Sequence, residues 1–165
     1  MRNTIYWIEG NTLGRLAIVP RPRGNDWLED EVTAWQQAGL NVIVSLLESA
    51  EANELGLSQE AALCEAAGLE FVSFPIADRS VPVARQAAME LAAKLASQLR
   101  QGKNIGVHCR QSVGRASLMA TSVMMALGIH PTEALRKISQ ARGCPVPETA
   151  QQYEWLTAFA LAQAA

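Results

Sequence analysis

This chain of 165 residues has few aromatic side chains and almost no excess of either charge. Phe, Trp and Tyr together make up 5% of the residues, so a buried core must consist mainly of aliphatic side chains and alanine. The 14 Lys and Arg residues against 16 Asp and Glu residues give a net charge of −2, which argues against a generic nucleic-acid-binding protein. Any anion that the chain binds must therefore be held by a few residues at one place.

Cysteine is also scarce, and the three thiols, Cys64, Cys109 and Cys144, are too far apart in sequence for a CxxC redox motif or a zinc knuckle. An odd number of cysteines is most simply explained by a reducing compartment. The longest stretch without a charge, residues 116–132, is interrupted by polar residues, glycine and proline, unlike the roughly 20 mostly apolar residues of a membrane-spanning helix. The first residues include Glu9 and no apolar run, unlike a signal peptide. We expect a soluble, cytoplasmic protein without membrane insertion.

The spacing of apolar residues divides the chain into alternating strands and helices, with no repeat and no linker. Strands are predicted at residues 4–8, 15–19, 41–47, 70–76 and 104–108, the first two as a hairpin. Helices are predicted at residues 26–38, 58–67, 83–101, 114–127, 131–141 and 147–164. Hydrophobic residues make up 49% of the chain and charged residues 18%, which excludes a disordered chain. We expect one α/β domain over residues 1–165, with a central, mostly parallel sheet flanked by helices on both faces.

The most informative segment, VHCRQSVGRA at residues 107–116, joins a buried strand to a helix. A five-residue loop between Cys109 and Arg115 can wrap round a tetrahedral oxyanion, with successive backbone N–H groups pointing inward. The helix N-terminus adds donors and a favourable dipole, and the planar fork of Arg115 can grip two oxygens of the same anion. A single cysteine after a buried strand is usually a packed small hydrophobe. The conjunction of strand, loop, arginine and helix instead predicts that Cys109 is a thiolate nucleophile.

The segment His108–Arg115 resembles the signature of the cysteine-dependent protein phosphatases, which is His-Cys, five residues and Arg. The chain is most similar to the compact dual-specificity group, which includes small bacterial members. Residues 74–82, with the sequence FPIADRSVP, resemble the segment that delivers the general acid of that group, here Asp78. The resemblance extends over roughly residues 26–155.

The resemblance implies a two-step reaction that needs no metal and no cofactor. Cys109 attacks phosphorus and forms a phosphocysteine. Asp78 protonates the leaving oxygen and then, as a carboxylate, takes a proton from the attacking water. Arg115 and the loop amides hold the phosphate oxygens and stabilise the transition state. The residues predicted to bind phosphate are Arg110, Gln111, Ser112, Val113, Gly114 and Arg115.

Four residues near these segments are weaker candidates. His108 is expected to be a buried histidine that hydrogen-bonds the loop backbone and tunes Cys109. Gln152 follows a segment that resembles the group's closing segment, so it either positions the hydrolytic water or is a surface glutamine. Glu48 and Glu51 follow a predicted strand and are interpreted as turn or helix-start residues rather than catalytic ones.

Arg79, Arg110 and Arg142 either ring the pocket and attract a phosphorylated substrate or are solvated surface residues. Cys64 can form a disulfide with Cys109 only if the fold brings the two thiols together, and the spacing of the two residues in the sequence does not show whether it does.

Two positions depart from the pattern of the phosphatase group. Ala116 stands where the group usually has Ser or Thr, whose hydroxyl stabilises the leaving thiolate in the second step. Ser112 stands where the group more often has Gly, and its side chain either reaches the thiolate or changes the loop. We expect breakdown of the phosphoenzyme to be slow relative to its formation.

Several functions stay open on the residues alone. The first is a phosphatase acting on phosphotyrosine proteins, with phosphoserine and phosphothreonine as further substrates. The absence of an obvious long tyrosine-recognition insert favours a shallower pocket and this broader substrate range. The second is the same chemistry on a non-protein phosphate, such as a phosphoinositide or a nucleotide end; a loop without lysine disfavours the phosphoinositide. A catalytically weak phosphate-binding module would need a distorted loop. An oxyanion reductase or sulfur-transfer enzyme would need a partner thiol. The expected partner is a phosphorylated protein, and the oligomeric state is left open.

Overall fold

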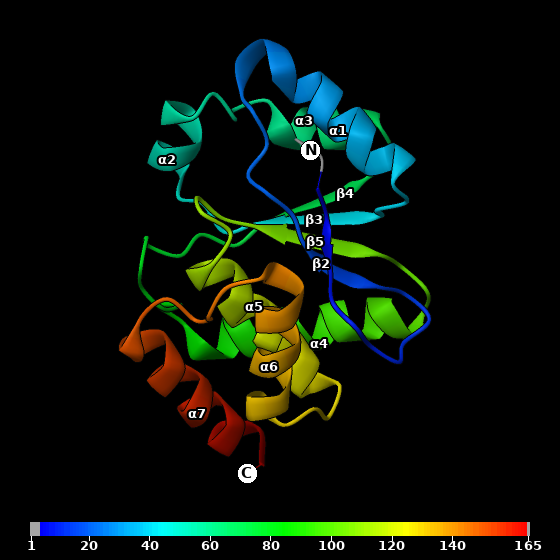
Figure 1. Cartoon of the computed structure of the whole chain (residues 1–165). Coiled ribbons are helices and arrows are strands. Elements are labelled where there is room, and N and C mark those ends of the chain that lie inside the picture. The colour runs from blue at the N-terminus through cyan, green and yellow to red at the C-terminus, as the bar shows by residue number, and fades with distance from the viewer. Residues whose placement is uncertain (1–3, 165) are drawn as a thin grey trace.

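A computed structural model describes residues 4–164 of the chain as five strands and eight helices (Figure 1). The strands are β1 (Tyr6–Trp7), β2 (Leu16–Ile18), β3 (Val42–Ser45), β4 (Glu70–Ser73) and β5 (Ile105–His108). The helices are the 3₁₀ helix η1 (Asn25–Trp27), α1 (Leu28–Gln37), α2 (Ser49–Glu54), α3 (Glu60–Ala66), α4 (Arg85–Arg100), α5 (Gly114–Ala126), α6 (Pro131–Arg142) and α7 (Ala150–Ala164).

The five strands form one sheet in the order β1-β2-β5-β3-β4. Strand β1 pairs antiparallel with β2, and the other three pairings are parallel. The prediction of a mostly parallel α/β sheet is therefore confirmed. Strand β5 lies in the middle, between β2 and β3, so the segment that follows it emerges at the centre of the sheet's carboxyl edge. Open parallel sheets bind ligands at that edge.

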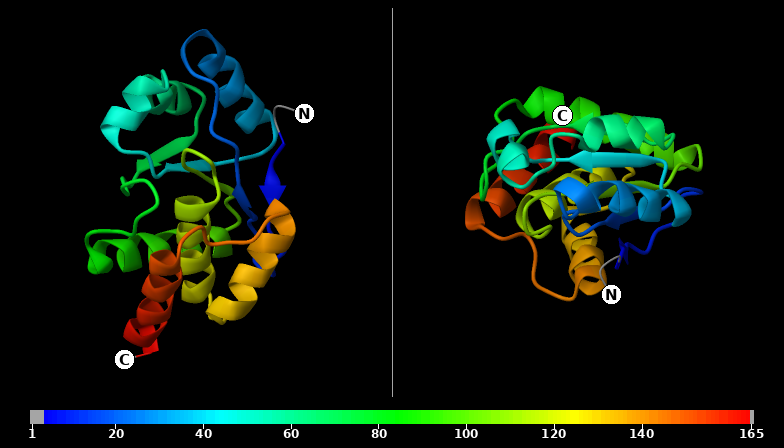
Figure 2. Two further views of the ribbon diagram at one scale, coloured as in Figure 1. Left: turned by 60° about the vertical axis from the view of Figure 1, so that its left-hand side comes forward. Right: turned by 90° about the horizontal axis from the view of Figure 1, so that it is seen from above.

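Helices cover both faces of the sheet, with α1, α2 and α3 on one side and α4 to α7 on the other (Figures 1 and 2). Side chains of β3 alternate between the two cores: Val42 and Val44 join the core beneath α4 to α7, and Ile43 joins the core beneath α1 and α3. All four residues of β3 and of β5 are buried, as expected for strands covered on both faces.

Most predicted elements are present with shorter bounds. The predicted helix over residues 26–38 begins as η1 and continues as α1, and the strand predicted over residues 70–76 ends at Ser73. Helix α2 is not among the predicted helices, because its six residues have no apolar periodicity and none of them is buried. This short helix follows β3 directly and therefore lies at the edge where β5 also ends.

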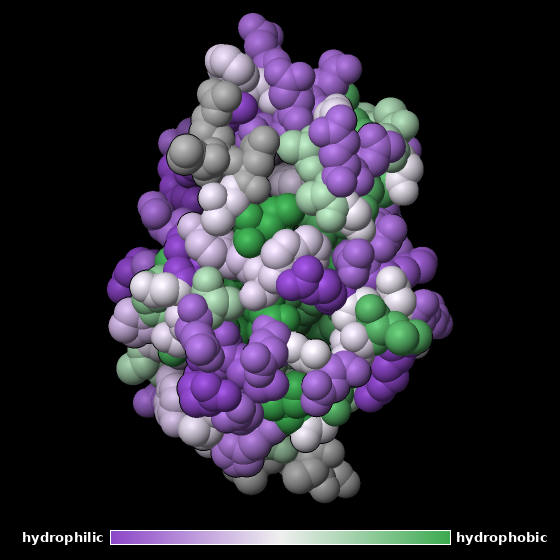
Figure 3. Space-filling model, turned by 45° about the vertical axis from the view of Figure 1, so that its right-hand side comes forward, coloured by the Kyte–Doolittle hydropathy of each residue, from purple (hydrophilic) through white to green (hydrophobic). Residues whose placement is uncertain are grey.

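The surface that Figure 3 shows is mainly hydrophilic, with hydrophobic residues in small separate areas. The large hydrophobic side chains that are exposed are Leu13, Trp27, Val83 and Tyr153. Within residues 4–164, no helix combines the length and the apolar character needed to cross a membrane.

Replacing Leu118 by alanine should destabilise the fold, because this α5 side chain is fully buried in the core beneath α4 to α7. Loss of a buried leucine and the cavity left behind cost about 2–5 kcal/mol of unfolding free energy, measured by urea unfolding. Leu13→Ala, at a position 83% exposed, is the control and should stay within about 0.5 kcal/mol of the wild type. Equal stability of the two variants would contradict the core described here.

Candidate active site

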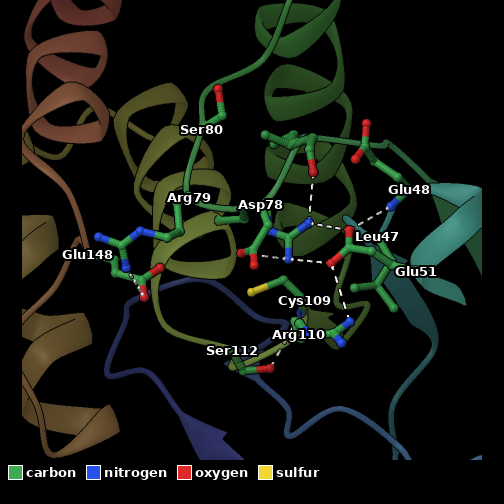
Figure 4. A network of polar contacts seen from close by, with 12 residues as sticks. Leu47, Glu48, Glu51, Asp78, Arg79, Ser80, Cys109, Arg110, Ser112 and Glu148 are labelled. Carbon is green, nitrogen blue, oxygen red and sulfur yellow. Dashed lines mark hydrogen bonds and ion pairs between the residues drawn. The ribbon is translucent and has the colours of Figure 1, made fainter. Parts of the chain in front are cut away.

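The loop of residues 109–113 begins where the central strand β5 ends and stops where α5 begins, as the sequence predicts. Cys109 is the first residue of this loop and is 2% exposed. Figure 4 shows its thiol pointing toward Asp78, which lies in a separate segment after β4. The sulfur therefore lies at the base of the site, where sheet, loop and helix meet.

Ser112 has a left-handed backbone conformation, with φ of 55°, and its hydroxyl stabilises that turn. The Oγ donates a hydrogen bond to the Val19 carbonyl at 2.7 Å and accepts one from the Cys109 N–H at 3.4 Å. This side chain therefore serves the loop backbone. Among the described residues, no acceptor lies on the backbone N–H groups of residues 110–113, which leaves them available to an anion.

Arg115 is 1% exposed, and its guanidinium makes four hydrogen bonds. Glu51 accepts from Nη1 at 2.7 Å and from Nη2 at 3.0 Å, a two-point contact between planar groups. The Ile76 carbonyl accepts from Nη1 at 2.7 Å, and Asp78 Oδ1 accepts from Nη2 at 3.0 Å (Figure 4). For the Nε–H of Arg115, no acceptor lies among the described residues.

The charges around Arg115 favour its ionised form. Burial would lower the pKa of the guanidinium, but its hydrogen bonds to Glu51 and the negative charges of Cys109, Glu51 and Asp78 raise that pKa above its ordinary value. The hydrogen bond from Arg115 in turn lowers the pKa of Glu51 below 4.5. Glu51 also accepts a hydrogen bond from the Glu48 N–H at 3.1 Å, which orients its carboxylate.

Glu51 thus starts a helix, as expected, but it also orients Arg115, which sequence reasoning missed. The two residues are 64 positions apart, and only the pairing of β3 with β5 brings them together. The available signal was the pair of glutamates, Glu48 and Glu51, shortly after a predicted buried strand.

Asp78 is half-exposed, and its segment is tied to the chain around α7 by two contacts. Arg79 pairs with Glu148 at 2.9 Å, and Gln152 Nε2 donates to the Ser80 carbonyl at 3.0 Å. The Oε1 of Gln152 accepts from the N–H groups of Glu148 and Thr149 at 3.1 and 3.2 Å.

Gln152 is fully buried rather than a surface glutamine, and both ends of its amide already have protein partners. To position the hydrolytic water, as expected, Gln152 would have to share or give up one of these contacts.

His108 is fully buried on the face opposite Cys109, where it packs against elements of the other core. Its Nε2 lies 2.6 Å from Glu60 Oε2, and its ring stacks on Trp35 with 6.0 Å between the centroids. Glu60 is 2% exposed, so α3 supplies a buried partner to the residue immediately before the nucleophile. The expectation that His108 hydrogen-bonds the loop backbone is therefore wrong: Nε2 bonds to Glu60, and Nδ1 has no partner among the described residues. The pair with Glu60 anchors the end of β5, and sequence spacing gave no sign of it.

Several weaker candidates lie elsewhere. Cys64 belongs to the core beneath α1 and α3, whereas Cys109 belongs to the core on the other side of the sheet. Burial, together with the negative charges of Glu60 and Glu65, raises the pKa of Cys64 to about 12. Cys64 is therefore a protonated thiol in a place unsuited to protecting Cys109. Ala116 is fully buried.

A family model described as polymorphic toxin system, DSP-PTPase phosphatase, matches residues 18–129, which is more than half of the chain. The chain belongs to this family. It is a phosphatase of the dual-specificity and tyrosine phosphatase type, whose members are cysteine-dependent enzymes. No curated protein matches the chain.

Solved structures of phosphatases have the same fold. A kinase associated phosphatase with serine in place of its catalytic-site cysteine is 20% identical, with a TM-score of 0.88 over 100% of this chain and 98% of that one. Tk-PTP in its active form is 24% identical, with a TM-score of 0.76 over 97% and 98%. PTPMT1 in complex with PI(5)P is 18% identical, with a TM-score of 0.74 over 96% and 99%. At these identities the likeness establishes the fold alone.

Replacing Glu51 by glutamine should lower the unfolding free energy by about 1–3 kcal/mol at pH 7, because it removes a charged hydrogen-bond partner of Arg115. Since the pKa of Glu51 is lowered in the folded state, its contribution is present above pH 4.5 and is lost as the pH falls through the folded pKa. The stability difference between wild type and variant should therefore shrink as the pH is lowered from 7 to 3 in urea unfolding.

Glu54→Gln is the matched control, because Glu54 lies on the same helix, is 68% exposed and is 3.9 Å from Arg110. Its stability curve should run parallel to that of the wild type. A pH-independent difference for Glu51→Gln would show that the contact with Arg115 is not an ion pair.

Proposed function

We propose that this domain, over residues 1–165, hydrolyses phosphate monoesters on phosphotyrosine proteins, and on phosphoserine and phosphothreonine proteins, through a phosphocysteine intermediate. The observation that carries the proposal is that one point in the structure is faced by a thiol, a buried guanidinium and a carboxylate. Cys109 and Arg115 stand at the two ends of one loop after β5, and Asp78 comes from a separate segment after β4 and contacts Arg115. The three free cysteines support a reducing, cytoplasmic setting.

In the first step the Cys109 thiolate attacks phosphorus, an S–P bond forms and the bond from phosphorus to the leaving oxygen breaks. The loop of residues 110–114 donates N–H groups to the equatorial oxygens, and the dipole of α5 favours their negative charge. Asp78 gives its proton to the leaving oxygen. Its position, half-exposed on the side toward which the Cys109 thiol points, fits a group that meets the leaving oxygen.

In the second step a water molecule attacks the phosphocysteine, Asp78 accepts its proton, and inorganic phosphate leaves as the thiolate re-forms. The hydroxyl of Ser117, the residue after Ala116, donates to the Gly114 carbonyl at 3.0 Å. Ser117 therefore does not replace the hydroxyl that Ala116 lacks. The second step proceeds without that stabilisation of the leaving thiolate.

Because Asp78 contacts Arg115, a phosphate binds by replacing Asp78 as an acceptor of the guanidinium. A bound phosphate can accept from the Nε–H of Arg115 and from the Nη2–H that Asp78 now accepts. Glu51 keeps its own two contacts with the other donors, so the guanidinium stays in place while Asp78 is released toward the leaving group. Substrate binding and placement of the general acid are then one event.

The balance of charge at the rim favours a substrate with a single phosphate group. Arg79 pairs with Glu148 at 2.9 Å, and Arg110 lies 3.9 Å from both Glu51 and Glu54. A headgroup with several phosphates needs cations that are not already balanced by carboxylates. A phosphorylated side chain in a protein presents one dianion, which the loop and Arg115 can hold.

Replacing Asp78 by asparagine should slow phenyl phosphate hydrolysis by about 10²–10⁴-fold, because a basic leaving oxygen needs a proton in the transition state. The loss should be much smaller for p-nitrophenyl phosphate, whose leaving group is weakly basic. Cys109→Ser should abolish turnover of both substrates. Steady-state kinetics with a metal chelator present, and with vanadate as inhibitor, measure these effects.

Asp30→Asn, at an exposed position on α1, is the control and should behave as the wild type. Near-normal hydrolysis of phenyl phosphate by Asp78→Asn would remove Asp78 from the mechanism. Tight binding of a phosphopeptide by a wild type that hydrolyses nothing would instead favour a binding module.

Replacing Ala116 by serine should speed the decay of the phosphocysteine, because a hydroxyl near the sulfur stabilises the departing thiolate. Rapid quench of the wild type with p-nitrophenyl phosphate should reveal an initial burst of p-nitrophenol and a phosphorylated Cys109 by mass spectrometry. Ala120→Ser, one helical turn further along the buried side of α5, is the control for a serine in this helix. An unchanged decay rate in Ala116→Ser would contradict the proposed role of this position.

A further inference from the structure

Arg142, the last residue of α6, does not face the phosphate site as an attracting cation. Its Nε donates a hydrogen bond to the Ser112 carbonyl at 2.9 Å, and its Nη2 donates to the Gln111 carbonyl at 3.2 Å. Both acceptors are backbone atoms of the loop of residues 109–113. One guanidinium thus contacts two successive peptide units of the phosphate-binding loop, from a helix outside the Cys-x5-Arg motif.

These two contacts determine where the loop N–H groups point. A trans peptide unit is planar, so its C=O and its N–H point in opposite directions. An arginine that holds the Gln111 carbonyl therefore directs the Ser112 N–H away from itself, and the contact with the Ser112 carbonyl does the same for the Val113 N–H. Neither of these N–H groups has an acceptor among the described residues.

The guanidinium of Arg142 is itself held in place. The ring of Tyr6, on edge strand β1, lies 4.4 Å from it, a distance typical of a cation–π contact. Arg21 extends the arrangement by one peptide unit, because its Nη1 lies 3.5 Å from the Arg110 carbonyl. The outer side of the loop is therefore lined by arginine donors, which leaves the N–H groups for the inner side.

We propose that Arg142, held by Tyr6, is a positioning residue that orients the loop amides toward the phosphate. This inference rests on the proposed phosphatase function and adds a residue that the signature motif does not contain. Without Arg142, the peptide units after Gln111 and Ser112 are free to rotate, and a carbonyl that turns inward repels the phosphate oxygens. The defect then lies in oxyanion binding and not in proton transfer.

Arg142→Ala should lower kcat/KM for p-nitrophenyl phosphate by about 10- to 100-fold, in the range expected for impaired oxyanion donors. The inhibition constant of vanadate should rise by a similar factor. The loss should be equal for phenyl phosphate, unlike the loss in Asp78→Asn. A variant that merely unfolds more easily would contain less active enzyme, with an unchanged vanadate inhibition constant.

Arg136→Ala is the matched control, because Arg136 lies on the same helix, is exposed and hydrogen-bonds Glu133 and Gln140 of that helix. It should match the wild type. If Arg142→Ala does not fold, Tyr6→Leu and Tyr6→Phe provide the test. Leucine removes the ring from Arg142 and should weaken vanadate inhibition several-fold, whereas phenylalanine keeps the ring and should not.

The proposal would be overturned if folded Arg142→Ala were inhibited by vanadate as strongly as the wild type. If Arg142→Ala does not fold, the same result in Tyr6→Leu would overturn it. Either result leaves the phosphatase function intact. A wild type that neither hydrolyses aryl phosphates nor binds vanadate would overturn the phosphatase function itself.

Discussion

A buried positive charge determines the arrangement of the whole site. The guanidinium of Arg115 is 1% exposed, and a charge that is removed from water must be surrounded by acceptors. Glu51, Asp78 and the Ile76 carbonyl supply them from segments that follow β3 and β4. The site therefore forms only when these segments pack round the end of β5. In the proposed reaction a phosphate dianion takes the place of Asp78 on this cation.

The second constraint is that, for the loop to bind phosphate, the N–H groups of several of its peptide units must point to one place. Ser112 provides the left-handed turn, and its hydroxyl bonds to the Val19 carbonyl on the strand side. Arg142 holds carbonyls on the outer side. Glu60 anchors His108 beneath the loop. The loop is thus a set of backbone donors whose conformation is held by its own Ser112 hydroxyl and by side chains of α3 and α6.

The sequence predicts those parts of this site that depend on residues close in the chain. The loop from Cys109 to Arg115 is recognisable because strand, loop and helix are contiguous, and the parallel sheet follows from buried runs alternating with helical periodicity. Glu51, Glu60 and Arg142 are not predictable in their roles, since each contacts the motif over 30 or more positions. Their side chains are ordinary surface types, and only the packing of α2, α3 and α6 in the folded chain brings them to the motif.

The most direct measurement is a crystal structure of the wild-type protein with vanadate. The account predicts vanadium bonded to the Cys109 sulfur, oxygens on Nε and Nη2 of Arg115 and on the N–H groups of the loop, and Asp78 moved from Arg115 to the apical oxygen. Glu51 and Arg142 should keep their present contacts. Vanadate bound away from Cys109, or a loop whose carbonyls point toward the anion, would contradict the central claim that this loop and Arg115 form a phosphate site.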